Sequence, residues 1–183
     1  MTSQSSEREA IRALKNGDIR GLEPLVRKYQ VQAVRAADLI TRDQALAEDI
    51  VQVAFLRAFK RIEQFNESRP FGPWFLRSVI NEAVKTVTRR PETLSLDNQS
   101  EISLEEILPA SEPQPEEWLE KQETCRRLWE ALGQLPPEQR AVIVLHYYLD
   151  LNLEEIGEVV AVPFGTIKWR LHKARMRLKK ILE

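Results

Sequence analysis

The chain has 183 residues, of which 43% are apolar and 30% are charged, a balance that is typical of globular proteins and excludes an intrinsically disordered one. The net charge of −1 is unevenly distributed, because residues 91–124 hold ten acidic side chains and one lysine, and this local −9 leaves +8 for the rest. The single cysteine, Cys125, excludes a disulfide within the chain.

Breaks in the apolar pattern divide the chain into three parts. Residues 1–90 and 115–183 have helical periodicity, whereas residues 91–114 are acidic and contain Pro109 and Pro113. No strand-like alternation persists anywhere in the sequence. The sequence therefore predicts an all-α protein with two small helical domains, joined by a flexible acidic linker.

The helix predicted over residues 43–61 is apolar almost all round. One side, with Ile50, Val53 and Ala54, is expected to face the core. The other side combines acidic, amide and large apolar groups, namely Glu48, Asp49, Gln52, Phe55, Leu56 and Phe59. A small domain does not fully bury such a face, so it predicts a protein partner. The alternative is that the two preceding helices cover it completely.

The helix predicted over residues 73–90 has an apolar stripe at helical spacing, formed by Leu76, Ile80, Ala83 and Val87. Its opposite face mixes one aromatic side chain with polar and cationic groups, namely Trp74, Arg77, Ser78, Asn81, Lys85 and Arg89. Such a surface can stack an unpaired base, hydrogen-bond its edge and hold its backbone. Equally, Trp74 can pack beneath a neighbouring helix, with Asn81 a plain surface amide.

The last thirty residues predict two short helices joined by a tight turn, the outline of a helix-turn-helix. Asn152 and Glu155 have the spacing of a capping box at the start of the first helix. Ala161 stands where glycine is common, so the sequence does not support a left-handed backbone in the turn. In the second helix one apolar stripe is expected to be buried, formed by Ile167, Leu171, Ala174 and Leu178.

Opposite that stripe lies a basic face without an acidic residue before Glu183. A recognition helix enters the major groove by its N-terminal end, so the first turns supply the candidates for base reading: Thr166, Lys168, Trp169, His172 and Lys173. The candidates for phosphate contacts are the arginines Arg170, Arg175 and Arg177. By charge alone a solvated lysine-rich surface is the alternative, and the two-helix context favours DNA.

Nothing in the chain predicts enzymatic chemistry. His146 and His172 have no neighbouring cysteine or carboxylate at ligand spacing, and the six glycines form no phosphate-binding loop. We therefore expect no catalytic residue, metal, cofactor or small-molecule substrate. The sequence has neither a signal peptide nor an apolar run of eighteen residues, which indicates a cytoplasmic protein.

Four motifs, in this order, resemble those of bacterial RNA polymerase σ factors of the extracytoplasmic function (ECF) class in the σ70 family. They are AEDIVQVAFLRAF at 47–59, FGPWFL at 71–76 followed by Asn81 and Arg89, LPPEQR at 135–140, and VPFGTIKWRLH at 162–172. The motifs cover both helical blocks, separated by a linker of suitable length. The chain also lacks room for the additional regions of housekeeping σ factors.

The resemblance implies that residues 1–90 form σ region 2, which binds the β′ clamp helices of core polymerase and recognises and melts the −10 element. Residues 115–183 would form σ region 4, which binds the β flap and reads the −35 element through residues 164–177. The polymerase-binding residues implied by the family's motif are Asp49, Gln52 and Phe55. Glu48 and Phe59, which lie on the same face of the helix, are added to them. The implied −10 residues are Phe65, Asn66, Trp74, Arg77, Asn81, Lys85 and Arg89. The resemblance also implies that an anti-σ factor binds the chain. It further implies that the acidic linker threads the active-site cleft of polymerase.

Two positions depart from the family pattern. Lys85 stands where the family often has aspartate, and Trp169 replaces the usual small residue on the outward face of the recognition helix. We expect Trp169 to make an apolar contact, such as one with a thymine methyl group, to shift the docking angle of the helix, or to contact a protein partner. We therefore expect an unusual −35 preference. The main alternative for the whole chain is an autonomous helix-turn-helix regulator that binds duplex DNA without polymerase. A third is an adaptor that acts by protein contacts only.

Overall fold

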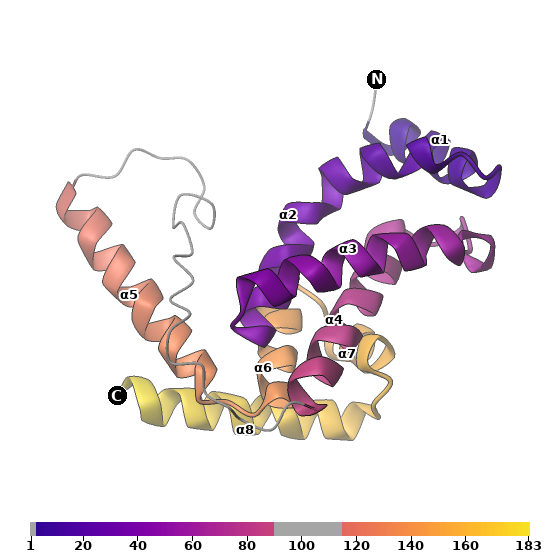
Figure 1. Ribbon diagram of the computed structural model, residues 1–183. Coiled ribbons are helices and arrows are strands. Elements are labelled where there is room, and N and C mark those ends of the chain that lie inside the picture. The colour runs from indigo at the N-terminus through magenta and orange to yellow at the C-terminus, as the bar shows by residue number, and fades with distance from the viewer. Residues whose placement is uncertain (1–2, 90–114) are drawn as a thin grey trace.

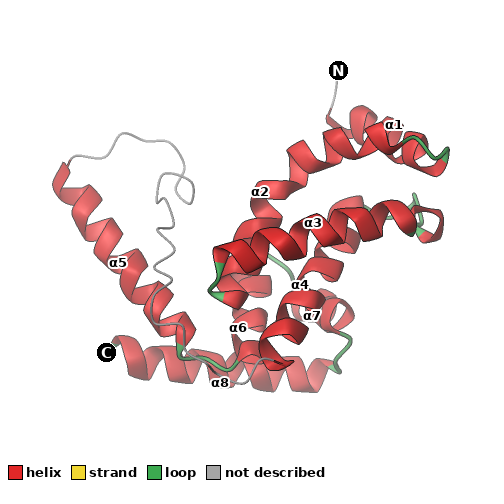
Figure 2. Cartoon of the chain, viewed as in Figure 1, coloured by secondary structure: helices red, strands yellow, loops and turns green. Residues whose placement is uncertain are grey.

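The computed structural model describes residues 3–89 and 115–183, and in these residues it contains helices, turns and loops but no strand (Figures 1 and 2). The first block consists of α1 (Ser3–Lys15), α2 (Leu22–Thr41), α3 (Gln44–Lys60) and α4 (Phe71–Arg89), with short 3-10 turns at Ile19–Gly21 and Ile62–Gln64. The second block consists of α5 (Pro115–Gly133), α6 (Pro137–Ile143), the π-helical segment η4 (Val144–Tyr148), α7 (Leu153–Val160) and α8 (Phe164–Leu182). The predicted all-α fold is confirmed, and the linker predicted over 91–114 lies outside the described residues.

A two-residue connection turns the chain from α2 into α3. Arg42 adopts a left-handed backbone (φ 57°), and its N–H donates to the carbonyl oxygen of Asp38 at 2.7 Å, which ends α2. Asp43 is extended, and its side chain accepts from the N–H of Leu46 at 2.9 Å, which begins α3. This connection places α2 and α3 side by side, with α4 packed against both (Figure 1).

Aromatic rings fill much of the core of the first block. Phe71 and Phe75 are fully buried, and the ring of Phe55 stacks on Phe75 with 4.2 Å between centroids. Tyr29 of α2 packs on Phe71 at 5.7 Å, and its hydroxyl donates to Glu7 of α1 at 2.7 Å. Burial, with the hydrogen bond to Glu7, raises the pKa of Tyr29 to about 12. These contacts join α1, α2, α3 and α4 into one unit.

The core of the second block is aliphatic, with Leu145, Ile156 and Ile167 completely buried. It continues into the core of the first block, because α4 contacts α6 and α7 while α2 contacts α6 and η4. Figure 1 shows α6 and α7 beside α4. The two blocks are therefore packed together, an arrangement that the sequence left open.

Candidate nucleic-acid and partner-binding surfaces

Helix α3 presents a narrow polar and aliphatic strip to solvent. Asp49, Gln52, Val53 and Leu56 are all exposed, Leu56 by 52%, and they follow one another at i, i+3, i+4 and i+7. Glu48 is exposed beside them. We call these five residues the α3 strip. An exposed leucine and valine beside two carboxylates form a surface suited to a protein partner.

Phe55 is not part of that surface, contrary to the prediction from sequence. Its side chain is only 5% exposed and stacks on Phe75, because Phe55 lies on the side of α3 that faces α4. Phe59 is half-buried and packs on the same core. Val53, which we assigned to the core side, is 41% exposed instead. The sequence contained a signal for this exposure, because the i, i+3, i+4, i+7 spacing of the α3 strip places Val53 on the same side of the helix as Asp49, Gln52 and Leu56.

A second correction concerns Phe65, which was predicted to hold a flipped base. Phe65 is 3% exposed, with its ring 5.1 Å from Trp74 and 5.6 Å from Phe71. Trp74 itself is half-buried and lies 5.5 Å from Phe71, so most of its ring serves to pack the loop before α4. Asn66 is exposed, and its side chain accepts from the N–H of Ser68 at 2.9 Å, which shapes that loop.

The accessible part of α4 is a stripe of cationic and amide side chains. Arg77, Lys85 and Arg89 are exposed and Asn81 is half-buried, at successive intervals of four residues. We call these four residues the α4 stripe. On the neighbouring flank Glu82 pairs with Arg57 of α3, and this hydrogen bond lowers the pKa of Glu82 despite partial burial. The stripe therefore offers net positive charge along one line of the helix.

The turn between α7 and α8 has the geometry of a helix-turn-helix. Asn152 accepts from the N–H of Glu155 at 2.9 Å, and Glu155 accepts from the N–H of Asn152 at 2.8 Å, which confirms the predicted capping box. Ala161 adopts the left-handed conformation (φ 54°) that the sequence did not support. In this turn the backbone of Val162 comes close to Gly157, where an added Cβ would lie 3.0 Å from the carbonyl oxygen of Val162.

Helix α8 separates its apolar and basic sides as predicted. Ile167, Leu171 and Ala174 are buried, and Leu178 is half-buried. The outward face consists of exposed side chains, namely Lys168, Trp169, His172, Lys173, Arg175 and Arg177. Trp169 is 55% exposed, so its indole is largely free to contact another molecule. Thr166 is half-buried at the first turn of the helix.

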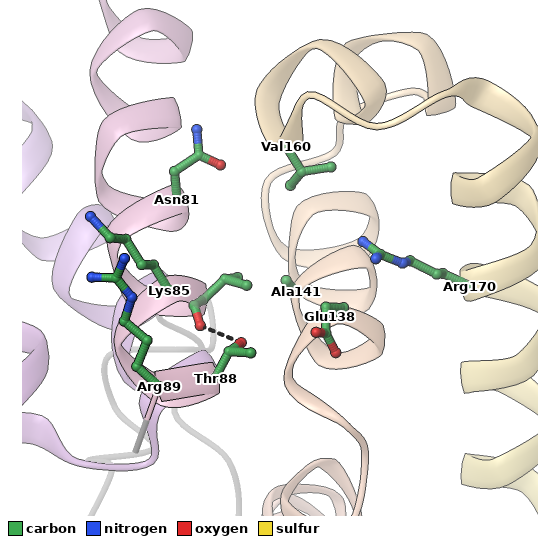
Figure 3. Close-up of a pocket in the computed structure, with 9 residues that line it drawn as sticks. Asn81, Lys85, Thr88, Arg89, Glu138, Ala141, Val160 and Arg170 are labelled. Carbon is green, nitrogen blue, oxygen red and sulfur yellow. Dashed lines mark hydrogen bonds between the residues drawn. The ribbon is translucent and has the colours of Figure 1, made fainter. Parts of the chain in front are cut away.

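The three arginines assigned to phosphate contacts occupy different environments. Arg175 lies over the ring of Tyr147 at 5.4 Å, and Arg177 donates to the side chain of Gln139 at 3.0 Å. Both contacts anchor exposed guanidinium groups on the second block. Arg170 is half-buried and points away from α8 toward α6 and α4 (Figure 3). The structure does not bring Arg170 onto the same face as Trp169.

A cavity of about 350 Å³ lies where α4 faces the second block. On one side Asn81, Lys85, Thr88 and Arg89 follow α4, and on the other Glu138, Ala141, Val160 and Arg170 come from α6, α7 and α8 (Figure 3). Three of the cavity's side chains are cationic and one is anionic. The α4 stripe thus borders the second block and is only partly open to a large ligand.

Two further observations concern the described residues alone. No group of three His, Cys, Asp or Glu side chains there is placed to hold a metal ion. None of their helices is long and apolar enough to cross a membrane.

Two family models match the chain, one over each block. The model for Sigma-70 region 2 matches residues 25–92, and the model for Sigma-70, region 4 matches residues 131–180. The ECF RNA polymerase sigma factor SigW of Bacillus subtilis is 29% identical over 179 residues, which cover 96% of each chain. The chain belongs to the σ70 family, in its ECF class. The α3 strip and the α4 stripe thus lie in σ region 2, and α8 lies in σ region 4.

A second curated relative agrees with the assignment of this chain to the ECF class. The ECF RNA polymerase sigma factor SigE of Mycolicibacterium smegmatis is 32% identical over 164 residues, covering 87% of this chain and 61% of SigE. Among solved structures, that of CnrH in complex with the cytosolic domain of CnrY has a TM-score of 0.66 at 22% identity and covers 97% of both chains. At that identity the likeness shows a shared fold.

Proposed function

We propose that this ECF σ factor binds the core of bacterial RNA polymerase and directs it to promoters by reading a −35 element and recognising and melting a −10 element. One observation supports the proposal above all: a region 2 unit with an exposed α3 strip and a region 4 unit with a basic recognition helix occur together in one chain. Such a protein selects the promoter, while RNA synthesis belongs to polymerase. Its site of action would be the cytoplasm, with the polymerase.

For the −35 element we propose that α8 enters the major groove by its N-terminal half. Thr166, Lys168, Trp169, His172 and Lys173 lie there and would meet base edges or flanking phosphates. Arg175 and Arg177, which are anchored by Tyr147 and Gln139, would hold the DNA backbone. We assign no −35 contact to Arg170 in this arrangement, because it points toward α4.

For the −10 element we propose that the α4 stripe contacts the separated strand. Arg77, Lys85 and Arg89 would neutralise its phosphates, and Asn81 would hydrogen-bond a base edge. Asn66 in the preceding loop is exposed and would lie close to that strand. Phe65 and most of Trp74 would act indirectly, by fixing the loop and the first turn of α4.

For core polymerase we propose that the α3 strip is the docking surface, with Asp49 and Gln52 at its centre and Leu56 as its apolar contact. The carboxylates would favour a basic partner surface. The sigma factor RpoE from Bartonella quintana, a structural neighbour of this chain, is found in complex with the anti-sigma factor NepR. We propose that an anti-σ factor likewise binds this chain. Residues 91–114 would serve as the acidic tether between the two regions.

The test compares charge-matched variants in binding to purified core polymerase. Asp49→Arg should weaken core binding by about tenfold or more, because it places a cation at the centre of the proposed interface. Glu9→Arg, an exposed position on α1 outside the region 2 match, should bind core as the wild type does. Equal binding by the wild type and Asp49→Arg would contradict the assignment of the α3 strip.

The wild-type chain and purified core polymerase also test the proposed function as a whole. The chain alone should bind promoter duplex weakly, and the chain with core polymerase should form a stable promoter complex. Tight, salt-dependent binding of a specific duplex by the chain alone, without any effect of core polymerase, would support an autonomous regulator instead.

A further inference from the structure

Helix α1 carries a row of cationic side chains that the proposed function does not use. Arg8 and Arg12 are exposed and Lys15 is half-buried, at intervals of four and three residues that place all three on one side of the helix. We call these three residues the α1 line. The acidic residues Glu7 and Glu9 each lie about 100° round the helix from Arg8, outside the line.

Two contacts fix α1 against the loop that leads into α4. The carboxylate of Glu7 accepts a hydrogen bond from the N–H of Phe71, the first residue of α4. Lys15, at the other end of α1, pairs with Glu67 of the loop at 2.8 Å. The turn η2, which precedes the loop, also packs against α1. The α1 line and residues 66–70 therefore form one continuous surface.

Two arginines of the α1 line bring positive charge that this surface does not compensate. The hydrogen bond from Lys15, with Arg12 and Arg8 nearby, lowers the pKa of Glu67, so this carboxylate is ionised and its charge is matched by Lys15. Among the residues that the structure describes, no hydrogen bond or ion pair engages the guanidinium group of Arg8 or Arg12. The exposed Arg69 adds a further cation in the loop. Such a surface attracts an anionic ligand.

The loop beside the α1 line has a defined shape and is open to solvent. Residues 66–70 are all exposed. The side chain of Asn66 accepts from the N–H of Ser68 at 2.9 Å, and its carbonyl oxygen accepts from the N–H of Arg69 at 3.0 Å. Figure 1 shows α1 at the opposite end of the molecule from α8. A nucleic-acid strand that contacts Asn66 can therefore reach the α1 line directly.

We propose that Arg8 and Arg12 form a further nucleic-acid contact, which binds phosphates of the separated promoter strand where it passes the loop at Asn66. A guanidinium group binds phosphate through two parallel hydrogen bonds, and these two arginines lie about 6 Å apart along the helix axis, which suits neighbouring phosphates of one strand. The contact reads no base, so it strengthens binding to any promoter sequence. The match to Sigma-70 region 2 begins at residue 25 and does not include α1. This proposal rests on the proposed function, because the loop at Asn66 is assigned to the −10 element.

Two double variants separate charge from structure at the α1 line. Arg8→Gln with Arg12→Gln removes both charges at exposed positions and leaves intact the two contacts that fix α1 to the loop. Arg8→Lys with Arg12→Lys keeps the charge and should retain most of the affinity, because the release of counterions depends on charge. Both variants should keep the helical circular dichroism of the wild type and unfold within a few degrees of it.

The matched control removes two arginines elsewhere on the surface. Arg27→Gln with Arg126→Gln changes the net charge by the same amount as the first double variant. Both arginines are exposed and pair with glutamates of their own helices, so neither belongs to the α1 line. Nucleic-acid binding by this control should match that of the wild type.

The first measurement follows amide NMR signals of the full-length chain, without polymerase, as single-stranded oligothymidine of about twelve nucleotides is added. In the wild type the signals of α1, Ser68 and Arg69 should shift, together with those of α8. In Arg8→Gln with Arg12→Gln the shifts at α1 and the loop should fall by about threefold or more, while those of α8 remain as an internal reference. No shift at α1 and the loop in the wild type, or equal shifts in the wild type and this variant, would overturn the proposal.

The second measurement uses the chain with core polymerase and a promoter fragment that is already unpaired at the −10 element. At 0.1 M salt Arg8→Gln with Arg12→Gln should bind it about five- to twentyfold more weakly, since each phosphate contact to a single strand contributes about fivefold there. The slope of log affinity against log salt should become shallower by about 1.4, or about 0.7 for each lost contact. A variant that keeps the wild-type affinity and slope would overturn the contact with the promoter.

The two measurements distinguish failure of this inference from failure of the proposed function. If the wild-type chain with core polymerase forms no promoter complex at all, the proposed function is contradicted. The spectra of the free chain need neither polymerase nor promoter, so they then decide by themselves whether the α1 line binds phosphates of a single strand.

Discussion

The aromatic side chains of the two blocks are used in opposite ways. In the first block Phe55, Phe65, Phe71 and Phe75 are all buried in the core. In the second block the buried apolar side chains are aliphatic, while Tyr147, Phe164 and Trp169 are exposed by 61%, 47% and 55%. An aromatic residue on an apolar helix thus indicates packing in one block and a contact surface in the other. The difference lies in the neighbours that each helix finds, which the sequence of one helix does not contain.

The largest effect is expected from cutting into the aromatic core of the first block. Phe75→Ala should lower the free energy of unfolding by about 3–5 kcal/mol, since it leaves a cavity between Phe55, Phe71 and Tyr29. Phe164→Ala, at an exposed aromatic residue of α8, should cost about 1 kcal/mol or less. Urea unfolding of both variants measures the difference, and equal losses would remove the contrast between the blocks.

The next effect concerns Asp38, a buried carboxyl group near the end of α2. It is 6% exposed, and burial, with Asp43 and Glu48 nearby, raises its pKa to about 6, although Arg42 opposes the rise. Its Oδ1 atom has no hydrogen-bond partner among the described residues. Between about pH 4 and pH 6 the folded state retains a proton that the unfolded state releases. This group therefore destabilises the fold as the pH rises through that window, and its full cost is present above pH 6.

Asp38→Asn removes that cost, because the amide stays neutral at every pH. At pH 7.5 the variant should be more stable than the wild type by about 2–3 kcal/mol, the equivalent of a shift of roughly two pKa units. The advantage should shrink as the pH falls toward 4, where Asp38 is protonated in both states. Urea unfolding at four pH values between 4.5 and 7.5 tests this, and a variant less stable at pH 7.5 would contradict it.

A smaller effect is expected at the start of α7. Asn152→Ala removes one half of the capping box and should lower the free energy of unfolding by about 1 kcal/mol. Glu155→Gln is the matched control, because glutamine can also accept from the N–H of Asn152 and should change stability little. Thermal unfolding compares the two, and an unaffected Asn152→Ala would show that packing alone positions α7.

The smallest effect on stability is expected at Trp169. Because its side chain is 55% exposed, Trp169→Ser should alter the free energy of unfolding by no more than about 0.5 kcal/mol. The same substitution should change the −35 sequences that are selected from a randomised promoter library, since it removes the largest group on the outward face of α8. An unchanged selection would show that Trp169 does not read the −35 element.

The sequence predicted the second block more accurately than the first. The capping box at Asn152 and the buried stripe of α8 were both read from spacing, because one face of each helix is plainly apolar and the other plainly polar. In α3 apolar residues occur on every side, so spacing alone did not decide whether Phe55 or Val53 would be exposed. The packing of α4 against α3 settles that question.

Contacts between distant parts of the chain could not be predicted from the sequence. Nothing in the local pattern indicated that Arg140 would donate to Ile40, one hundred residues away. The left-handed backbone of Ala161 was also unexpected, because this residue is not glycine. The glycine of that turn, Gly157, lies instead where the backbone of Val162 comes close. The contact of Arg140 with Ile40 follows from tertiary packing. The left-handed Ala161 is instead a local cap, because its N–H donates to the carbonyl oxygen of Gly157 and ends α7.

The most direct test of the central claim is transcription in vitro with purified core polymerase, this chain and a library of genomic fragments, followed by sequencing of the RNA 5′ ends. We predict discrete start sites that depend on the chain and are preceded by two shared motifs, at the spacing of −10 and −35 elements. The absence of chain-dependent start sites, with specific binding of duplex DNA by the chain alone, would contradict its function as a σ factor.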